Sequence, residues 1–143
     1  MAGTLNILKL SVGTKSVEGL EKWQRGKRAQ GGDGMPRHVT RMWPKRAEEL
    51  LDGGSIFWVI QGVVLARQRI LRLDEVRRAD GVRRCGLVLE PKLIRTEAQP
   101  RRPFQGWRYL PGSEAPRDLP EGRQDEPSLP PKLLEVLAEI GVR

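Results

Sequence analysis

Hydrophobic and polar residues alternate along much of the chain, a pattern typical of β-strands with one buried face. In residues 4–12, for example, Leu8 and Leu10 alternate with polar neighbours. The run 56–60 is hydrophobic throughout, which is typical of a strand covered on both faces or closed in a barrel. Residues 63–76 favour a strand, with a helix as the alternative. We therefore expect strands at residues 4–12, 38–43, 56–60, 63–76 and 82–96.

The dipeptide Asp80-Gly81 is the strongest local signal in the chain. It matches a two-residue hairpin turn, which needs positive φ at its centre, and would join residues 70–79 to the strand at 82–96. On that second strand Cys85, Leu87 and Leu89 share one face, which we interpret as core with a small buried cysteine. Pro91 suggests an edge or a bulge.

Three short helices are expected. Ser16 is a good N-cap, and hydrophobic residues follow from Val17 at helical spacing. Pro44 often opens a helix, so a second is predicted over residues 45–51. The third covers residues 130–143, where one hydrophobic stripe is formed by Leu133, Val136, Leu137 and Ile140. That stripe docks on the protein's own core, the favoured interpretation, or on a partner.

These elements predict one domain of the α+β class. Its core, residues 1–110, would be a small, curved, mostly antiparallel β-barrel with short helices at its rim. Residues 25–37 would form a basic, glycine-rich loop. Residues 111–129 are rich in Pro, Gly, Asp and Glu and predict an extended connector, which leads to the amphipathic helix at 130–143.

The charge of the chain adds a prediction about its binding partner. The chain of 143 residues has a net charge of +8. Residues 1–110 hold 22 basic and 11 acidic side chains, whereas residues 111–143 hold 4 basic and 7 acidic ones. A basic body rich in arginine attracts polyanions, and the arginine fork binds phosphate in a bidentate manner. We expect nucleic acid as the partner, with RNA favoured over DNA. The alternative is a solvated basic surface without a specific partner.

Several other classes of function find no support in the sequence. No hydrophobic run approaches the roughly 20 residues of a membrane helix, and no secretory leader is expected. One histidine and one cysteine, Cys85, leave no usual zinc site and no internal disulfide, which fits a cytoplasmic protein. No phosphate-binding glycine motif is present. We expect no cofactor and no metal, and a monomer or a weak homo-oligomer.

Two segments, residues 38–46 and 101–109, combine guanidinium groups with large flat rings. Guanidinium groups bind phosphates, and aromatic rings stack on unpaired bases. The predicted phosphate contacts are Arg41, Lys45, Arg46, Arg101, Arg102 and Arg108; stacking would come from Trp43 or Trp107, and Gln105 would read a base edge. The structural alternative is that Trp43, Phe104, Trp107 and Tyr109 are ordinary core residues.

These segments also carry a resemblance. Four motifs together resemble an uncharacterised bacterial family, the domain of unknown function numbered 1489. They are HVTRMWPKR, ELLDGGSIFWVIQGVVLARQRIL, RRCGLVLEPKLIRTE and RPFQGWRYL. The resemblance is expected over residues 4–110 and not in the tail. More distantly, the order of elements is similar to the PUA-like superfamily, especially its EVE and ASCH branches, although Asp52-Gly53-Gly54 departs from the usual order of that step. This similarity implies a small curved barrel that binds RNA or captures a modified base in an aromatic pocket.

The leading hypothesis is therefore a non-enzymatic nucleic-acid-binding module. The first alternative is a small ribonuclease or base-modifying enzyme of the same superfamily, with His38 or Lys45 as the catalytic group, because His38 is the only side chain that ordinarily titrates near neutrality. The second alternative is a protein-interaction module that uses the C-terminal stripe.

Overall fold

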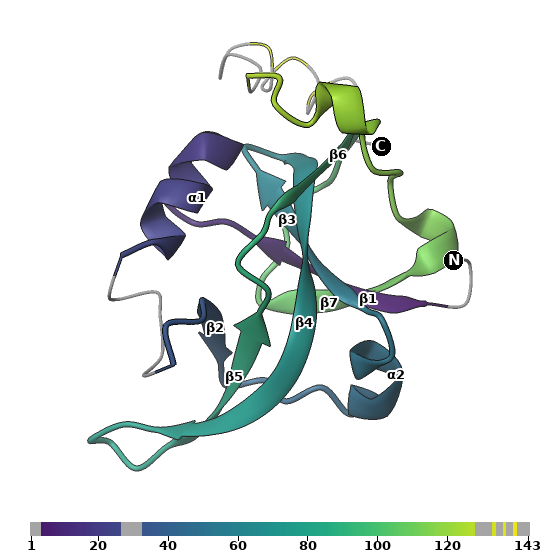
Figure 1. Ribbon diagram of the computed structural model, residues 1–143. Helices are drawn as coiled ribbons and strands as arrows, with labels where there is room; N and C mark the ends of the chain where they lie inside the picture. Colours follow the sequence, from purple (N-terminus) through teal and green to yellow (C-terminus); the bar gives the residue numbers. More distant parts are fainter. Residues whose placement is uncertain (1–3, 27–32, 128–132, 134–135, 137–138, 140–143) are drawn as a thin grey trace.

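The computed structural model describes residues 4–26, 33–127 and the single positions 133, 136 and 139. These residues form seven strands, two α-helices and two short 3-10 helices (Figure 1). The strands are β1 (Leu5–Leu10), β2 (Arg37–Thr40), β3 (Ser55–Ile60), β4 (Val63–Arg77), β5 (Arg83–Leu89), β6 (Ile94–Pro100) and β7 (Trp107–Pro111). The helices are α1 (Val17–Gln24), α2 (Ala47–Leu51), η1 (Gly112–Glu114) and η2 (Glu121–Arg123).

The strands form one mixed, mostly antiparallel sheet in the order β2-β5-β4-β3-β1-β7, and only β1 and β3 pair in parallel. The first half of β4 lies between β3 and β6, and its second half pairs with β5. Figure 1 shows β4 as a long curved ribbon that crosses the whole molecule. The α+β class and the antiparallel majority are thus confirmed.

The predicted closure into a barrel is wrong. Closure would require the two end strands of the sheet, β2 and β7, to pair with each other, and they do not. The chain that leaves β2 instead crosses to β7 as a loop, where the Trp107 indole N–H donates to the Met42 carbonyl at 2.8 Å. Side-chain hydrogen bonds replace the backbone ladder that a barrel would have there.

The core lies on both faces of the central strands. One cluster includes Ile7, Ile56 and Trp58, and the other includes Leu8 and Phe57. Every residue of β3 is buried, which confirms that its unbroken hydrophobic run is covered on both sides. The helix alternative for residues 63–76 is wrong, because this segment is the long strand β4.

The helix starts follow local chemistry. The hydroxyl of Ser16 accepts a hydrogen bond from the Gly19 N–H at 3.0 Å, so the predicted cap of α1 is confirmed. The second predicted helix is shorter than expected and begins at Ala47. Gly54 then joins α2 to β3 at a close approach, since a Cβ there would lie 2.2 Å from the Leu50 carbonyl oxygen. No other residue fits that position without a backbone shift.

The β4–β5 hairpin is confirmed at the predicted place, but its turn is longer than two residues. β4 ends at Arg77 and β5 begins at Arg83. Gly81 has the expected positive φ, 72°, and its N–H donates to the Arg78 carbonyl at 2.9 Å. The Asp80 carboxylate accepts from the Val82 N–H at 3.1 Å and stabilises the turn. The predicted strand 82–96 is divided into β5 and β6.

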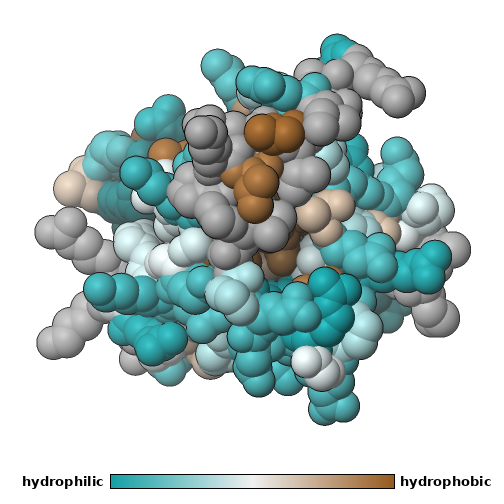
Figure 2. Space-filling view, turned by 90° about the horizontal axis from the view of Figure 1, so that it is seen from above, coloured by the Kyte–Doolittle hydropathy of each residue, from teal (hydrophilic) through white to brown (hydrophobic). Residues whose placement is uncertain are grey.

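Residues 111–127 fold back onto β6. The Glu97 N–H donates to the Arg117 carbonyl, and the Leu119 N–H donates to the Arg95 carbonyl. The predicted helix at 130–143 is not among the elements of the structure, because that stretch lies almost entirely outside the described residues. The helices that are described are too short or too polar to cross a membrane. Viewed from above (Figure 2), the surface is mostly hydrophilic, with one small hydrophobic area.

Candidate nucleic-acid interface

The two segments expected to carry the site do meet in space. Besides the hydrogen bond from Trp107 to Met42, the Tyr109 hydroxyl accepts from the Arg46 backbone N–H at 3.0 Å. The rings of Trp107 and Tyr109 lie edge to face, with centroids 4.9 Å apart. Segment 41–46 therefore runs along β7, although the two segments are about sixty residues apart in the sequence.

The predicted residues do not share one face, however. Consecutive residues of β7 point to opposite sides of the sheet. Trp107 lies in the core cluster of Ile7, with Tyr109 packed against it, whereas Arg108 pairs with Leu8 and belongs to the other side. The Arg108 guanidinium covers the ring of Phe104 at 5.1 Å. Arg108 is thus separated by the sheet from Trp107.

The predicted stacking rings are largely core. Trp107 is 5% exposed and its N–H is already bonded, so it offers no face to a base. Phe104 is buried as well. Trp43 is partly buried, and the Arg83 guanidinium lies over its ring at 4.0 Å from the centroid. The structural alternative therefore describes Trp107 and Phe104 correctly.

Some of the predicted cations are already hydrogen-bonded or ion-paired within the described chain, and others are not. Arg46 forms a two-pronged ion pair with Glu49, at 2.6 and 2.9 Å. The Arg101 guanidinium donates to the Gln99 side-chain carbonyl at 2.8 and 3.0 Å. The remaining predicted cations and Gln105 are exposed and form no side-chain hydrogen bond or ion pair to the described part of the chain; they are Arg41, Lys45, Arg102, Arg108 and Gln105.

A pocket that the sequence did not reveal lies beside these segments. It has a volume of about 190 Å³ and opens between the end of β1, α1, β2 and β3. Its walls are formed by Lys9, Leu10, Ser11, Val12, Thr14, Leu20, Trp23, His38 and Trp58. The pairing registers place Trp58, Lys9 and Trp107 side by side across β3, β1 and β7. Lys9 thus separates the pocket from the buried Trp107.

A buried amide network fixes the orientation of Trp58. The Gln68 side-chain carbonyl accepts from the Trp58 indole N–H at 2.9 Å and from the Gln24 amide at 2.8 Å. The Gln68 amide in turn donates to the Gln24 side chain at 2.7 Å and to the Glu90 carbonyl at 3.0 Å. Gln68 is fully buried, so these bonds hold one ring orientation against the pocket.

His38 forms the inner wall of the pocket. Its ring meets Trp58 edge to face, with centroids 5.8 Å apart. Burial, followed by the nearby charge of Lys9, lowers the pKa of His38 to about 4, so the imidazole is neutral at pH 7. Its Nε2 is buried and has no hydrogen-bond partner among the described residues. A neutral imidazole has one donor and one acceptor, and no described residue uses the one at Nε2.

The rim of the pocket is both aromatic and polar. Trp23, on α1, is 54% exposed, which is high for a tryptophan. Lys9 donates to the Leu10 carbonyl at 3.2 Å, and burial lowers the pKa of its ammonium group. The hydroxyls of Ser11 and Thr14 are hydrogen-bonded to each other. Flat rings, hydroxyls, a cation and an imidazole thus line one small cavity.

Comparison with known proteins gives a family and no precedent for activity. Residues 7–143 match the family described as "Protein of unknown function (DUF1489)". The chain belongs to this family. The match continues through the tail, so the expectation that the resemblance ends at residue 110 was wrong. No curated protein and no solved structure matches the chain.

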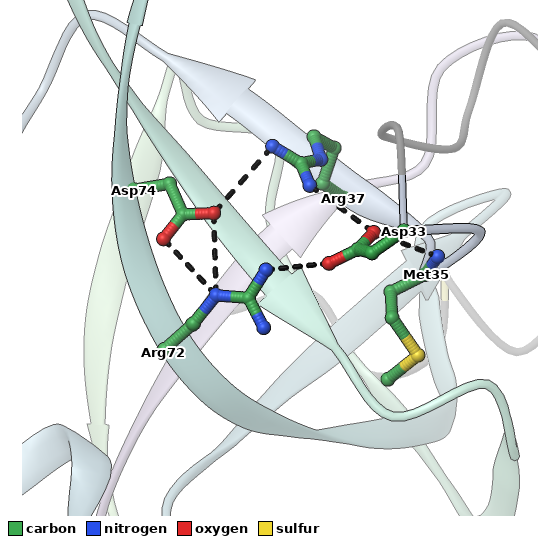
Figure 3. A network of polar contacts seen from close by, with 5 residues as sticks. All are labelled: Asp33, Met35, Arg37, Arg72 and Asp74. Atoms are coloured by element: carbon green, nitrogen blue, oxygen red, sulfur yellow. Dashed lines mark hydrogen bonds and ion pairs between the residues drawn. The ribbon is translucent and has the colours of Figure 1, made fainter.

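In this member of the DUF1489 family, a second group of charges is balanced within itself. Figure 3 shows Arg37 and Arg72, from β2 and β4, between Asp33 and Asp74. Arg72 bonds both carboxylates, at 2.5 Å to Asp33 and at 3.1 and 3.2 Å to Asp74. The hydrogen bond from Arg72 is the main reason that the pKa of Asp33 falls to about 2. The two positive and two negative charges balance each other. This network therefore holds Asp33, at the end of the basic loop, and leaves little positive charge to bind phosphate.

Other places in the described chain are weaker candidates. A polar hollow of about 310 Å³ on the opposite side of the sheet contains Arg67, but Asp118 holds that guanidinium through two hydrogen bonds, at 2.7 and 2.8 Å. Burial raises the pKa of Cys85 to about 11, which keeps this thiol protonated and unreactive. Among the described residues no group of three or more His, Cys, Asp or Glu side chains could hold a metal ion.

Proposed function

We propose that this protein binds RNA and takes one unpaired base into the pocket between His38, Trp58 and Trp23. The observation that carries the proposal is the pocket lined by two tryptophan rings, a lysine and a neutral His38, whose buried Nε2 has no partner among the described residues. A polar atom left without a partner in a cavity costs stability unless a ligand or water satisfies it. A nucleobase satisfies it and stacks on the rings at the same time.

The dimensions of the pocket suit one base. Its 190 Å³ is smaller than the roughly 300–1,000 Å³ typical of sites for drug-sized ligands. Stacking of a base on an aromatic side chain contributes roughly 1–3 kcal/mol, and Trp23 at the rim has the exposed face that such stacking needs. The Watson–Crick edge of the base would then point toward His38. The similarity to PUA-like domains, stated above, is in keeping with this ligand.

The cations around the pocket favour a polyanion over a free base. Arg41 and Lys45 lie three and seven positions after His38 in the chain, are exposed and lack ion pairs within the described residues. Unpaired bases are the usual targets of sequence-specific RNA recognition, whereas paired bases are hidden in the helix. This is the reason to favour single-stranded RNA or an RNA loop over duplex DNA.

The test is binding of a labelled single-stranded RNA to the full chain. Trp23→Ala removes a rim ring without opening the core, and we expect about tenfold weaker binding, within the range for one lost stacking contact. Leu71→Ala is the control, because Leu71 is also a large exposed hydrophobic residue, 42% exposed, but lies on β4 outside the pocket.

Salt provides the second readout. If phosphates are bound, the affinity falls steeply between about 50 and about 200 mM salt, because bound counterions are released. Equal affinity of the wild type and Trp23→Ala would contradict base capture. An affinity that does not change with salt would contradict the phosphate contacts.

A further inference from the structure

The β4–β5 hairpin extends beyond the rest of the sheet as an arm (Figure 1). β3 pairs with β4 only as far as Arg69, and β2 pairs with β5 only from Cys85 onward. Residues 76–84, at the end of the hairpin, therefore have no neighbouring strand on either side. Most of these residues are exposed, among them Arg77 and Arg83, so their side chains are available to a partner.

The two faces of the arm differ in charge. Pairing places Arg77 opposite Arg83 on the face of the hairpin that continues from Cys85, a core residue. These two guanidinium groups share a single carboxylate, that of Glu75, at 3.3 and 2.6 Å. We call this the front face, defined by Glu75, Arg77 and Arg83.

The reverse face is neutralised. It carries Arg84, which pairs with Asp80 at 2.7 Å, and farther along the balanced network of Figure 3. At the turn, Arg41 lies near enough to Asp80 to contribute to its lowered pKa, and the hydrogen bond from Arg84 contributes most. Positive charge is therefore in excess on the front face and near the turn.

The front face is physically connected to the proposed base pocket. Arg83 lies on the ring of Trp43, which belongs to the loop leaving β2. His38, at the pocket, pairs with Leu87 on the same strand that carries Arg83. Four residues of strand separate Leu87 from Arg83, which corresponds to roughly 13 Å along β5. An RNA strand a few nucleotides long can span this path.

We propose that the front face of the arm binds the phosphates of the RNA strand that enters the pocket. This inference rests on the proposed function and extends the binding site from one base to several nucleotides. The side chains of Arg77 and Arg83 are 56% and 52% exposed, and ion pairs at such exposed positions contribute little stability. Phosphates can therefore replace Glu75 as their partner, and each guanidinium can bind one phosphate in a bidentate manner.

The test compares two single-stranded RNAs: one of about two nucleotides, too short to reach from the pocket to the arm, and one of about twelve, which is within the range of site sizes known for such proteins. In Arg77→Gln/Arg83→Gln, the slope of log affinity against log salt for the longer RNA should fall by about 1.4, because each lost phosphate contact contributes about 0.7. Binding of the short RNA should be unchanged. Arg77→Lys/Arg83→Lys keeps both charges and should keep the slope.

Arg123→Gln is the matched control, since Arg123 is also 56% exposed and paired to one glutamate, Glu126, but lies far along the chain on η2. An unchanged slope in the double glutamine variant overturns the arm proposal alone. Equal losses for both RNAs overturn it too, because the arginines would then act on the pocket or the fold. Competition by polyglutamate as strong as that by RNA would indicate an acidic protein partner instead. A wild type that binds neither RNA overturns the proposed function as well.

Discussion

Acid should destabilise this protein well above the pH at which its carboxylates protonate, and one residue accounts for the effect. His38 is the only histidine in the chain. Its pKa is about 4 in the folded protein, against about 6.5 in the absence of burial. Between these values the unfolded chain binds a proton that the folded protein excludes. The free energy of unfolding therefore falls as the pH falls from about 6.5 toward 4.

The magnitude follows from the two pKa values. Each pKa unit corresponds to about 1.4 kcal/mol, so the full difference is about 3 kcal/mol. The part lost between pH 7 and pH 5 is about 2 kcal/mol, because the unfolded histidine is almost fully protonated at the lower pH while His38 in the folded protein is still neutral. For a chain of this size that is a substantial fraction of the total stability.

The assay is urea unfolding at the two pH values, followed by tryptophan fluorescence. His38→Gln is the control, because glutamine is polar, does not titrate and leaves every carboxylate in place. We expect the wild type to lose about 2 kcal/mol more than the variant between pH 7 and pH 5. Equal losses in the two proteins would refute the claim that the imidazole is buried in its neutral form.

Three further outcomes are expected. Gly54→Ala should lower the free energy of unfolding by about 3 kcal/mol or more in thermal or urea unfolding, because its Cβ would overlap the Leu50 carbonyl, whereas Gly122→Ala, with open space around it, should be near neutral. Gln68→Leu should cost about 2–4 kcal/mol in the same assay, since it removes the acceptor of the buried Trp58 N–H and of one hydrogen bond from the Gln24 amide. Arg108→Gln should leave RNA affinity and its salt slope unchanged in the binding assay, because Arg108 lies across the sheet from the pocket; a reduced slope would contradict this placement.

The strands and the capped helix were predictable because their signals are local. The alternation around Leu8, the unbroken run of β3 and the serine before α1 each depend on residues within a few positions of one another. Gly81 was predictable for the same reason, since the turn needs positive φ there. The turn is longer than predicted because the Asp80 side chain bonds the Val82 N–H, a bond that extends the turn toward β5.

The open sheet and the pocket depend on contacts between distant residues. No local pattern around β2 predicts that β2 and β7 remain unpaired, or that the loop after β2 crosses to β7. The pocket combines Trp23 from a helix with His38 and Trp58 from two different strands. The local sequence around each of these residues predicts its helix or strand but not that the three lie together. The helical spacing after Ser16 left either Trp23 or Gln24 to follow Val17 and Leu20 on the buried side of α1, and the structure shows that Gln24 is buried and Trp23 is 54% exposed.

The charge count was correct, but a count does not distinguish the arginines that are already paired from those that are available to a ligand. Much of the positive charge is neutralised in place: Arg67 by Asp118, Arg72 by two aspartates and Arg84 by Asp80. A guanidinium that already has a bidentate carboxylate must break that pair before it can bind phosphate. Under the proposed function, the arginines available to RNA are those without an ion pair among the described residues, such as Arg41, or those that share one carboxylate, as on the front face. Those positions, and not the richest arginine segments, determine where the strand would lie.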